Sequence, residues 1–356
     1  MRKLYLDNIR WATVLLVLIY HVFYLFNGAG IPGGIPGAES IPLFDAAACV
    51  IYPWFMVLLF VVAGMSARYA LQRRTARQFV KERAVKLLLP STLGLFAVHW
   101  VTGYLNIRLG GGLAYLPPAL IYPISVLSGT GPLWFIQMLF LFSCVLVLLR
   151  KLDAGDQLWA FCGRANAPIV ILLFLPIWGA AQVGNLPVLT MYRFGIYWAA
   201  FLIGFYIISH EGVQGAIQRA RVPAACLAAV SGVFYVLRYG GGNYTSPGCL
   251  QSPLTNLYLW AVVLAVLGWG RKYWNRATPF TRYMVKSSFG LYVLHYPVLM
   301  VVCCTLHGCF HLPAIWNYAI ALAAELPLTF AAYEAVRRVP VLRYVVLGIQ
   351  RGEAEK

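Results

Sequence analysis

Long apolar stretches recur along the whole chain of 356 residues, and this is the feature that most restricts how it can fold. A helix that spans a bilayer needs about 20 mostly apolar residues. Charged residues make up only 11% of this sequence, far below the roughly 25% of an average soluble domain. The sequence predicts an all-α polytopic membrane protein, with residues 1–356 forming a single bundle of about ten transmembrane helices. The expected spans are 10–27, 47–67, 87–105, 132–149, 167–184, 192–209, 222–238, 253–270, 287–305 and 314–333.

Basic residues fall almost entirely on one side of this predicted topology. With the N-terminus inside, 25 of the 28 Lys and Arg residues lie in cytoplasmic segments, and only Arg108, Arg193 and Arg238 lie outside. Cytoplasmic loops of membrane proteins carry such an excess of basic residues. We therefore expect both termini to be cytoplasmic. The net charge of +17 would attract anionic lipid or an anionic cytosolic ligand, and nothing further in the sequence supports nucleic-acid binding.

Arg10 and His21 share one face of the first apolar segment. Eleven residues at about 100° each complete three turns with only about 20° to spare, and they rise about 16.5 Å. Arg10 can therefore stay at the membrane surface while His21 lies near the midplane. An ionisable side chain at that depth is a candidate functional residue. The alternative is a polar hydrogen bond between helices with no chemical role.

A second histidine is expected near the midplane in the ninth segment. Ser288 and His295 are seven residues apart and lie on nearly the same helix face, with Tyr292 one turn before the histidine. Burying two histidines independently would be costly without partners. A neutral imidazole can accept a proton and return it, so a midplane histidine suits general base catalysis on a hydroxyl group.

The most charged connection runs from Arg68 to Lys86. Arg83 and Lys86 are three residues apart and hence neighbours on a helix. We expect them to form a cationic site at the cytoplasmic end, where they could bind phosphate groups. The alternative is a charge cluster that only orients the chain in the membrane.

Two features of the predicted external loops have more than one interpretation. Residues 113–127 are apolar and could form a re-entrant helix, an interfacial helix or a partial eleventh span. Cys249 and Cys309 lie in two other external loops, where they could pair as a disulfide or remain free thiols. The eight cysteines show no spacing typical of a metal site, so we expect no metal.

Several motifs, taken in order, resemble acyltransferase family 3, whose members are bacterial integral membrane enzymes. The opening Leu6-Asp7-Asn8-Ile9-Arg10, followed by ten residues and His21, is similar to the start of that family. Segments similar to later family motifs follow at 53–66, 83–90, 132–135 and 292–297, and residues 334–338 followed by 347–348 are similar to the usual C-terminal ending. The resemblance is closest to the glucan-biosynthesis-protein-C-like branch. One departure is Lys86, which stands where an arginine is common, so that a bidentate phosphate contact is replaced by a point charge.

The resemblance implies a pore that holds acyl-coenzyme A, with acetyl as the default acyl group. The implied acceptor is a hydroxyl group on an extracytoplasmic glycan, lipid or small molecule, and the implied location is the bacterial cell membrane. In this interpretation His21 is the general base, and a transient acyl-histidine is a less favoured variant. His295, Tyr292 and Ser288 would orient the base or stabilise the oxyanion. The expected donor-binding residues are Arg10, Arg83, Lys86, Trp134 and Phe135.

A secondary transporter is the competing interpretation, in which the same histidines would relay protons. No inverted repeat or pair of broken helices supports it. The sequence leaves open the acyl chain, the acceptor and whether the protein forms a homodimer.

Overall fold

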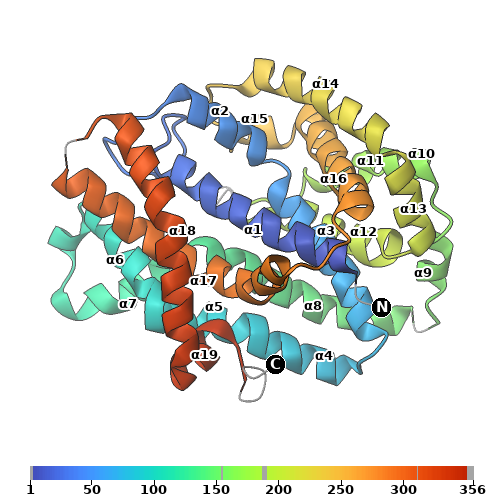
Figure 1. Ribbon diagram of the computed structural model, residues 1–356, viewed down its shortest axis with the longest axis horizontal. Coiled ribbons are helices and arrows are strands. Elements are labelled where there is room, and N and C mark those ends of the chain that lie inside the picture. Colours follow the sequence, from blue (N-terminus) through green and yellow to red (C-terminus); the bar gives the residue numbers. More distant parts are fainter. Residues whose placement is uncertain (1–2, 154, 187–190, 311, 351–356) are drawn as a thin grey trace. The chain divides into compact units, whose positions relative to one another are not determined.

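The protein is built from helices, as a computed structural model shows for residues 3–153, 155–186, 191–310 and 312–350 (Figure 1). No strand forms within these ranges. Eight helical segments in the described chain are long and apolar enough to cross a membrane. They are α1 (Leu4–Leu25), Pro42–Leu71, Ala76–Leu109, Gly131–Leu152, α14 (Arg221–Tyr239), α16 (Pro253–Tyr273), α17 (Pro279–Cys309) and α18 (Ala314–Arg338). The predicted all-α polytopic membrane fold is therefore confirmed.

The longer segments are made of several pieces, and shorter helices connect them. Three pieces are π-helices, namely η1 (Ala84–Leu88), η2 (Leu95–His99) and η5 (Gly204–Ile208). Two are 3₁₀ turns, η3 (Gly112–Tyr115) and η4 (Gly131–Leu133). The α-helical pieces are α2 (Pro42–Ile51), α3 (Phe55–Leu71), α4 (Ala76–Arg83), α5 (Leu89–Gly94), α6 (Trp100–Leu109), α7 (Pro118–Ser128), α8 (Trp134–Leu152), α9 (Gln157–Cys162), α10 (Ala167–Leu172), α11 (Phe174–Ala180), α12 (Phe194–Ile203), α13 (Glu211–Arg219), α15 (Pro247–Leu250) and α19 (Pro340–Leu347).

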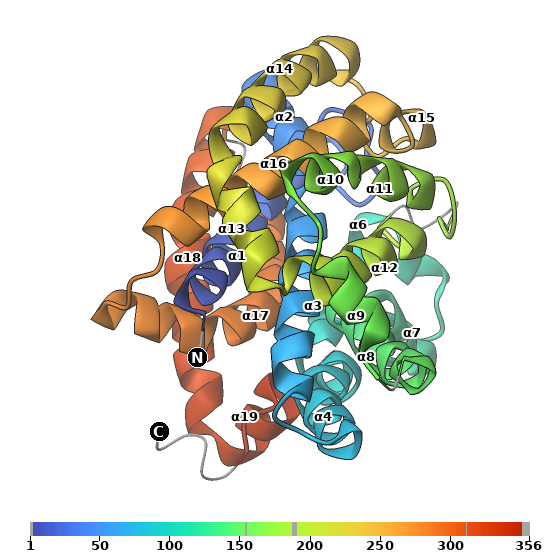
Figure 2. The same cartoon turned by 90° about the vertical axis from the view of Figure 1, so that its right-hand side faces the viewer.

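Two of the ten predicted spans differ in the structure. The segment predicted at 167–184 is divided into the short helices α10 and α11, which together cover only Ala167–Ala180 (Figure 2). Pro176 has no N–H for the carbonyl of Leu172, which weakens the helix where α10 ends. The segment predicted at 192–209 bends by 103° before α13, so that the two helices count together as a ninth span or as a re-entrant loop.

The described chain divides into two compact units, each assembled from separate stretches of sequence. Unit 1 comprises residues 1–13, 46–80 and 141–285, and unit 2 comprises residues 14–45, 81–140 and 286–356. Helices α1, α4, α8 and α17 each begin in one unit and end in the other. The prediction of one domain over 1–356 stays a prediction.

In unit 1, close backbone contacts hold α3 against α12 and η5. A Cβ atom at Gly64 would lie 2.0 Å from the carbonyl oxygen of Phe201, and one at Gly204 would lie 2.2 Å from that of Val61. Only glycine permits the two helices to approach so closely. Helices α14 and α16 lie side by side in the same unit (Figures 1 and 2).

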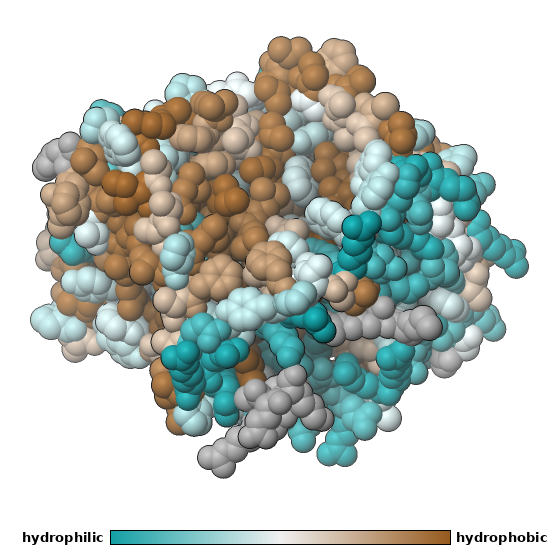
Figure 3. All heavy atoms as spheres, viewed as in Figure 1, coloured by the Kyte–Doolittle hydropathy of each residue, from teal (hydrophilic) through white to brown (hydrophobic). Residues whose placement is uncertain are grey.

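The outer surface of α14 is apolar (Figure 3). Its exposed large side chains are Val222, Val230, Val233, Phe234 and Leu237. A soluble protein rarely leaves so many apolar side chains in contact with water. In a membrane protein this surface can face lipid.

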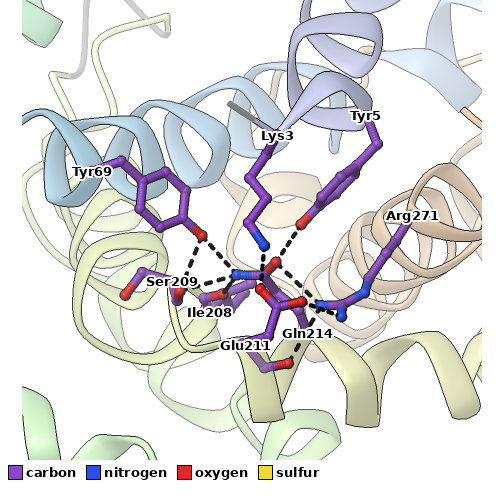
Figure 4. Close-up of polar contacts among 8 residues, drawn as sticks. All are labelled: Lys3, Tyr5, Tyr69, Ile208, Ser209, Glu211, Gln214 and Arg271. Atoms are coloured by element: carbon purple, nitrogen blue, oxygen red, sulfur yellow. Dashed lines mark hydrogen bonds and ion pairs between the residues drawn. The ribbon is translucent and has the colours of Figure 1, made fainter. Parts of the chain in front are cut away.

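A buried glutamine organises the polar side chains around the N-terminal end of α1, also in unit 1 (Figure 4). The Gln214 side-chain oxygen accepts hydrogen bonds from the Tyr5 hydroxyl at 2.8 Å and from Arg271 at 3.2 Å. The Gln214 side-chain nitrogen donates to the Tyr69 hydroxyl at 2.7 Å and to two carbonyl groups of the bend before α13, those of Ile208 and Ser209. Every polar atom of the buried amide therefore has a partner, as burial requires.

Glu211, at the start of α13, completes this network (Figure 4). It forms ion pairs with Lys3, which directly precedes α1, and with Arg271 of α16. The Glu211 side chain is 62% exposed, so water screens both pairs. We refer to Lys3, Tyr5, Tyr69, Glu211, Gln214 and Arg271 as the N-terminal network.

In unit 2, α6 and α7 form a tightly packed helical hairpin. A Cβ atom at Gly103 would lie 1.8 Å from the carbonyl oxygen of Ser125, and one at Gly129 would lie 2.2 Å from that of His99. Helix α7 covers most of the apolar segment 113–127. A short helix there is compatible with all three interpretations of this segment, so the choice among them stays open.

Both Cys249 and Cys309 are free thiols in the structure, and Cys249 is buried.

Candidate functional site

The two predicted midplane histidines, His21 of α1 and His295 of α17, lie in contact within unit 2. Nε2 of His295 lies 3.2 Å from Nδ1 of His21, and the two ring centroids are 5.0 Å apart. His295 is completely buried, whereas His21 is half-buried. The two residues are 274 positions apart in the sequence, so only the fold brings them together.

Backbone carbonyl groups fix the proton position on both rings. Nδ1 of His21 lies 2.8 Å from the carbonyl oxygen of Val17, and Nδ1 of His295 lies 2.6 Å from that of Tyr292. A carbonyl oxygen can only accept a hydrogen bond, so each Nδ1 must carry a proton. In a neutral imidazole the other nitrogen, Nε2, then has a free lone pair. The geometry thus selects the same tautomer for both histidines.

This assignment gives the histidine pair a direction. The lone pair on Nε2 of His295 faces the Nδ1–H of His21, which shares its hydrogen between His295 and the Val17 carbonyl. Nε2 of His21 is then the basic atom at the other end of the pair. Within the described residues it has no hydrogen-bond partner. An unpartnered imidazole nitrogen on a half-buried ring is available to accept a proton.

Tyr292 connects the histidine segment of α17 to the start of α8. Its hydroxyl donates a hydrogen bond to the carbonyl oxygen of Pro132 at 2.5 Å, and its ring lies edge-on to that of Phe135 at 5.6 Å. The Tyr292 hydroxyl proton is therefore used by the backbone. Trp134 and Phe135 are both buried at the start of α8, with centroids 6.3 Å apart.

Ser288 is not part of this contact. It is buried on α17, about 10.5 Å before His295 by the helical rise of 1.5 Å per residue. No hydrogen bond joins Ser288 to His295, Tyr292 or His21 in the described chain. The predicted grouping of Ser288 with His295 therefore rests on the shared helix face alone.

Arg10 lies in unit 1 and is held by neighbours on α1 and α3. It pairs with Asp7, one turn earlier, at 3.0 Å and donates to the hydroxyl of Ser66 at 2.8 Å. The guanidinium group is partly exposed, at 37% for the side chain. The sequence analysis predicted neither Asp7 nor Ser66 as a partner of Arg10. The three-residue spacing of Asp7 and Arg10 is typical of a helical ion pair and could have indicated the first of them.

Arg83 and Lys86 lie in unit 2, where α4 passes into the π-helix η1. Both side chains are half-buried. Lys86 is within 3.4 Å of Glu82, which precedes it by four residues. The predicted cationic pair therefore includes an acidic neighbour, which the spacing of Glu82 and Lys86 could have indicated.

Tyr296 also belongs to the site and was not predicted as a site residue. Its ring lies edge-on to that of His21, with centroids 5.1 Å apart. A Cβ atom at Gly131 would lie 3.0 Å from the Tyr296 ring, and Gly131 has a φ of +41°. Glycine is thus favoured at this position by its conformation and by the nearby ring.

Comparison with known proteins gives one informative result. Residues 3–334, nearly the whole chain, match the family model that describes an acyltransferase domain. No curated protein and no solved structure matches the chain. Among the described residues, no group of three or more His, Cys, Asp or Glu side chains is arranged to hold a metal ion.

Proposed function

This chain belongs to acyltransferase family 3, and we propose that it transfers an acyl group from acyl-coenzyme A to a hydroxyl group, with His21 as the general base. Family membership makes it a membrane acyltransferase for groups other than amino-acyl groups. The observation that carries the finer proposal is the unpartnered Nε2 of His21, because a general base needs an accessible lone pair.

The reaction that we propose follows from this tautomer. Nε2 of His21 removes the proton from the acceptor hydroxyl, and the oxygen attacks the carbonyl carbon of the thioester. The tetrahedral intermediate collapses, the carbon–sulfur bond breaks, and the coenzyme A thiolate leaves. The thiolate takes the proton back from Nε2, so that His21 is neutral again and no net proton is consumed.

His295 supports this step by orienting His21. When His21 becomes an imidazolium, its Nδ1–H donates towards the lone pair of His295 and towards the Val17 carbonyl. These two acceptors stabilise the charged ring and keep Nε2 directed towards the acceptor. The arrangement corresponds to a nucleophile–base–orienting group triad in which a neutral histidine replaces the usual carboxylate.

For the donor we propose acyl-coenzyme A, with acetyl as the acyl group. Coenzyme A is polyanionic, and Arg10, Arg83 and Lys86 are cationic residues of predicted cytoplasmic segments. Arg10 precedes His21 on α1 by about 16.5 Å at 1.5 Å per residue, which would separate the phosphates from the thioester along the helix. Trp134 and Phe135 are the proposed apolar contacts of the donor.

For the acceptor we propose a glycan, lipid or small molecule with a free hydroxyl group, reached from outside a bacterial cell membrane. Acyl transfer between a cytosolic donor and an outer acceptor requires a base that both can reach. What supports this is the position of His21 four residues before the predicted outer end of α1, in contact with His295 near the middle of α17.

The test is to incubate the purified protein in lipid with radiolabelled acetyl-coenzyme A and cell-envelope fractions, and to follow the label. We expect a labelled envelope product from the wild-type protein and none from His21→Ala. His307→Leu, a substitution of a second histidine of α17, is the matched control and should form product. Label transported without any acylated product would instead support a transporter.

A further inference from the structure

A proline interrupts the hydrogen bonding of α17 next to His295. In an α-helix the N–H of residue 297 would donate to the carbonyl of Val293, but Pro297 has no N–H. The Val293 carbonyl therefore loses its helical partner two residues before His295. An unsatisfied carbonyl in a buried segment would be costly and would leave the helix free to bend.

His99 supplies the missing donor. Its Nε2 lies 2.8 Å from the carbonyl oxygen of Val293, and the side chain is completely buried. Because the carbonyl can only accept, Nε2 of His99 must carry the proton. His99 therefore adopts the opposite tautomer to His21 and His295.

The position of His99 is itself closely defined. It is the last residue of the π-helix η2, and such wide turns change the direction of side chains relative to a regular helix. Gly129 lies against the His99 carbonyl and Gly103 against Ser125, so the helices carrying these residues pack with almost no space between their backbones. The His99 ring can thus act as a rigid contact on α17.

We propose that His99 is a positioning residue, which fixes the proline-interrupted turn of α17 and thereby holds His295 in register with His21. This inference rests on the function proposed above for its effect on the reaction. Its effect on the orientation of His295 is independent of that function. No hydrogen bond or ring contact joins His99 to His21 in the described chain, so we expect His99 to act through the position of His295 and not by transferring a proton.

Three substitutions distinguish positioning from general stabilisation. His99→Leu removes the donor, and we expect kcat to fall about tenfold, because a misplaced catalytic group lowers the rate even when binding is kept. The KM for acetyl-coenzyme A should stay unchanged. His99→Gln retains an N–H donor and should restore most of kcat. Pro297→Ala returns a backbone N–H to the Val293 carbonyl, so that adding His99→Leu in this background should cost little.

The measurement that does not depend on activity is ¹⁵N NMR of the labelled histidine rings in the purified protein. We expect His99→Leu to shift or broaden the His295 signals and the combined His99→Leu and Pro297→Ala protein to restore them. His307→Leu is the control and should leave His295 unchanged.

Unchanged His295 signals in folded His99→Leu, or an equal loss of kcat with and without Pro297→Ala, would overturn the proposal. If His99→Leu shifts the His295 signals but the wild-type protein forms no acylated product, the positioning role is supported and the proposed function is contradicted.

Discussion

The two parts of α1 present opposite solutions to placing polar groups among apolar helices. In the N-terminal network, Gln214 has partners for its whole amide, and Glu211 meets two cations. Further along the same helix, His21 contacts His295 of α17, and one nitrogen of the pair, Nε2 of His21, has no hydrogen-bond partner in the described part of the chain. Groups that are fully paired contribute stability, whereas a group left open can react. The difference predicts which substitutions change activity and which change unfolding.

The largest effect is expected from His21→Ala. Removing a positioned general base should lower kcat by roughly 10²–10⁴-fold. The thermal unfolding temperature should fall less than in Gln214→Leu, because His21 is half-buried and its Nε2 makes no hydrogen bond in the described chain, although the Nδ1–H contact with His295 and the ring contact with Tyr296 are lost. Kinetic assays beside thermal unfolding in detergent would check both parts, and near wild-type transfer would contradict the proposed mechanism.

His295→Leu should have the next largest effect. It removes the lone pair that faces the His21 Nδ1–H but leaves the Val17 contact. We expect kcat to fall about 10²-fold, since an orienting group contributes less than the base that it orients. His295→Gln, whose amide oxygen can accept the same hydrogen bond, is the matched variant and should be less impaired. Equal loss in both variants would show that acceptance of this hydrogen bond is unimportant.

Arg83→Ala should affect donor binding and not the chemical step. If a charged hydrogen bond to a phosphate is lost, the apparent KM for acetyl-coenzyme A should rise by the equivalent of about 1.5–3 kcal/mol. The difference between mutant and wild type should shrink as salt is added. An unchanged KM for acetyl-coenzyme A in Arg83→Ala would contradict donor binding and would favour the alternative, that Arg83 only helps to orient the chain in the membrane.

Gln214→Leu should show the reverse of His21→Ala. It leaves several partners of the buried amide unsatisfied, so we expect a loss of about 1–3 kcal/mol in the free energy of unfolding. At temperatures where the variant is folded, kcat should match the wild type. A Gln214→Leu protein with normal stability and a lowered kcat would contradict the view that the N-terminal network serves stability and not the reaction.

The smallest effect is expected from Lys3→Ala. Its ion pair with Glu211 is exposed, so its loss should cost less than about 1 kcal/mol and should be masked by salt. Thermal unfolding at low and high salt would measure it. A larger, salt-independent loss would mean that Lys3 has a buried role.

The sequence was sufficient for the fold class, because eight of the ten apolar segments form long helices. It also singled out His21 and His295, since both are polar residues within apolar segments. No local pattern predicts their contact, because the two residues are 274 positions apart, and only the family resemblance implied that His295 acts on His21. The divided segment at 167–184 was missed because hydropathy alone does not register the effect of Pro176.

The partners of the charged residues were also missed, although local spacing could have indicated them. Asp7 lies three residues before Arg10, and Glu82 lies four residues before Lys86, and each forms an ion pair with that residue. The role of His99 is different in kind. Pro297 shows that the Val293 carbonyl lacks a donor, but only the structure shows which side chain supplies one.

The most direct test of the account is the protonation state of the His21 ring. ¹⁵N NMR of histidine-labelled protein, with the His21 signals assigned by comparison with His21→Ala, would show which nitrogen carries the proton. We predict a proton on Nδ1 and a free lone pair on Nε2 at a pH where the ring is neutral. A neutral His21 protonated on Nε2 would contradict it, because that nitrogen could not then accept a proton from the acceptor.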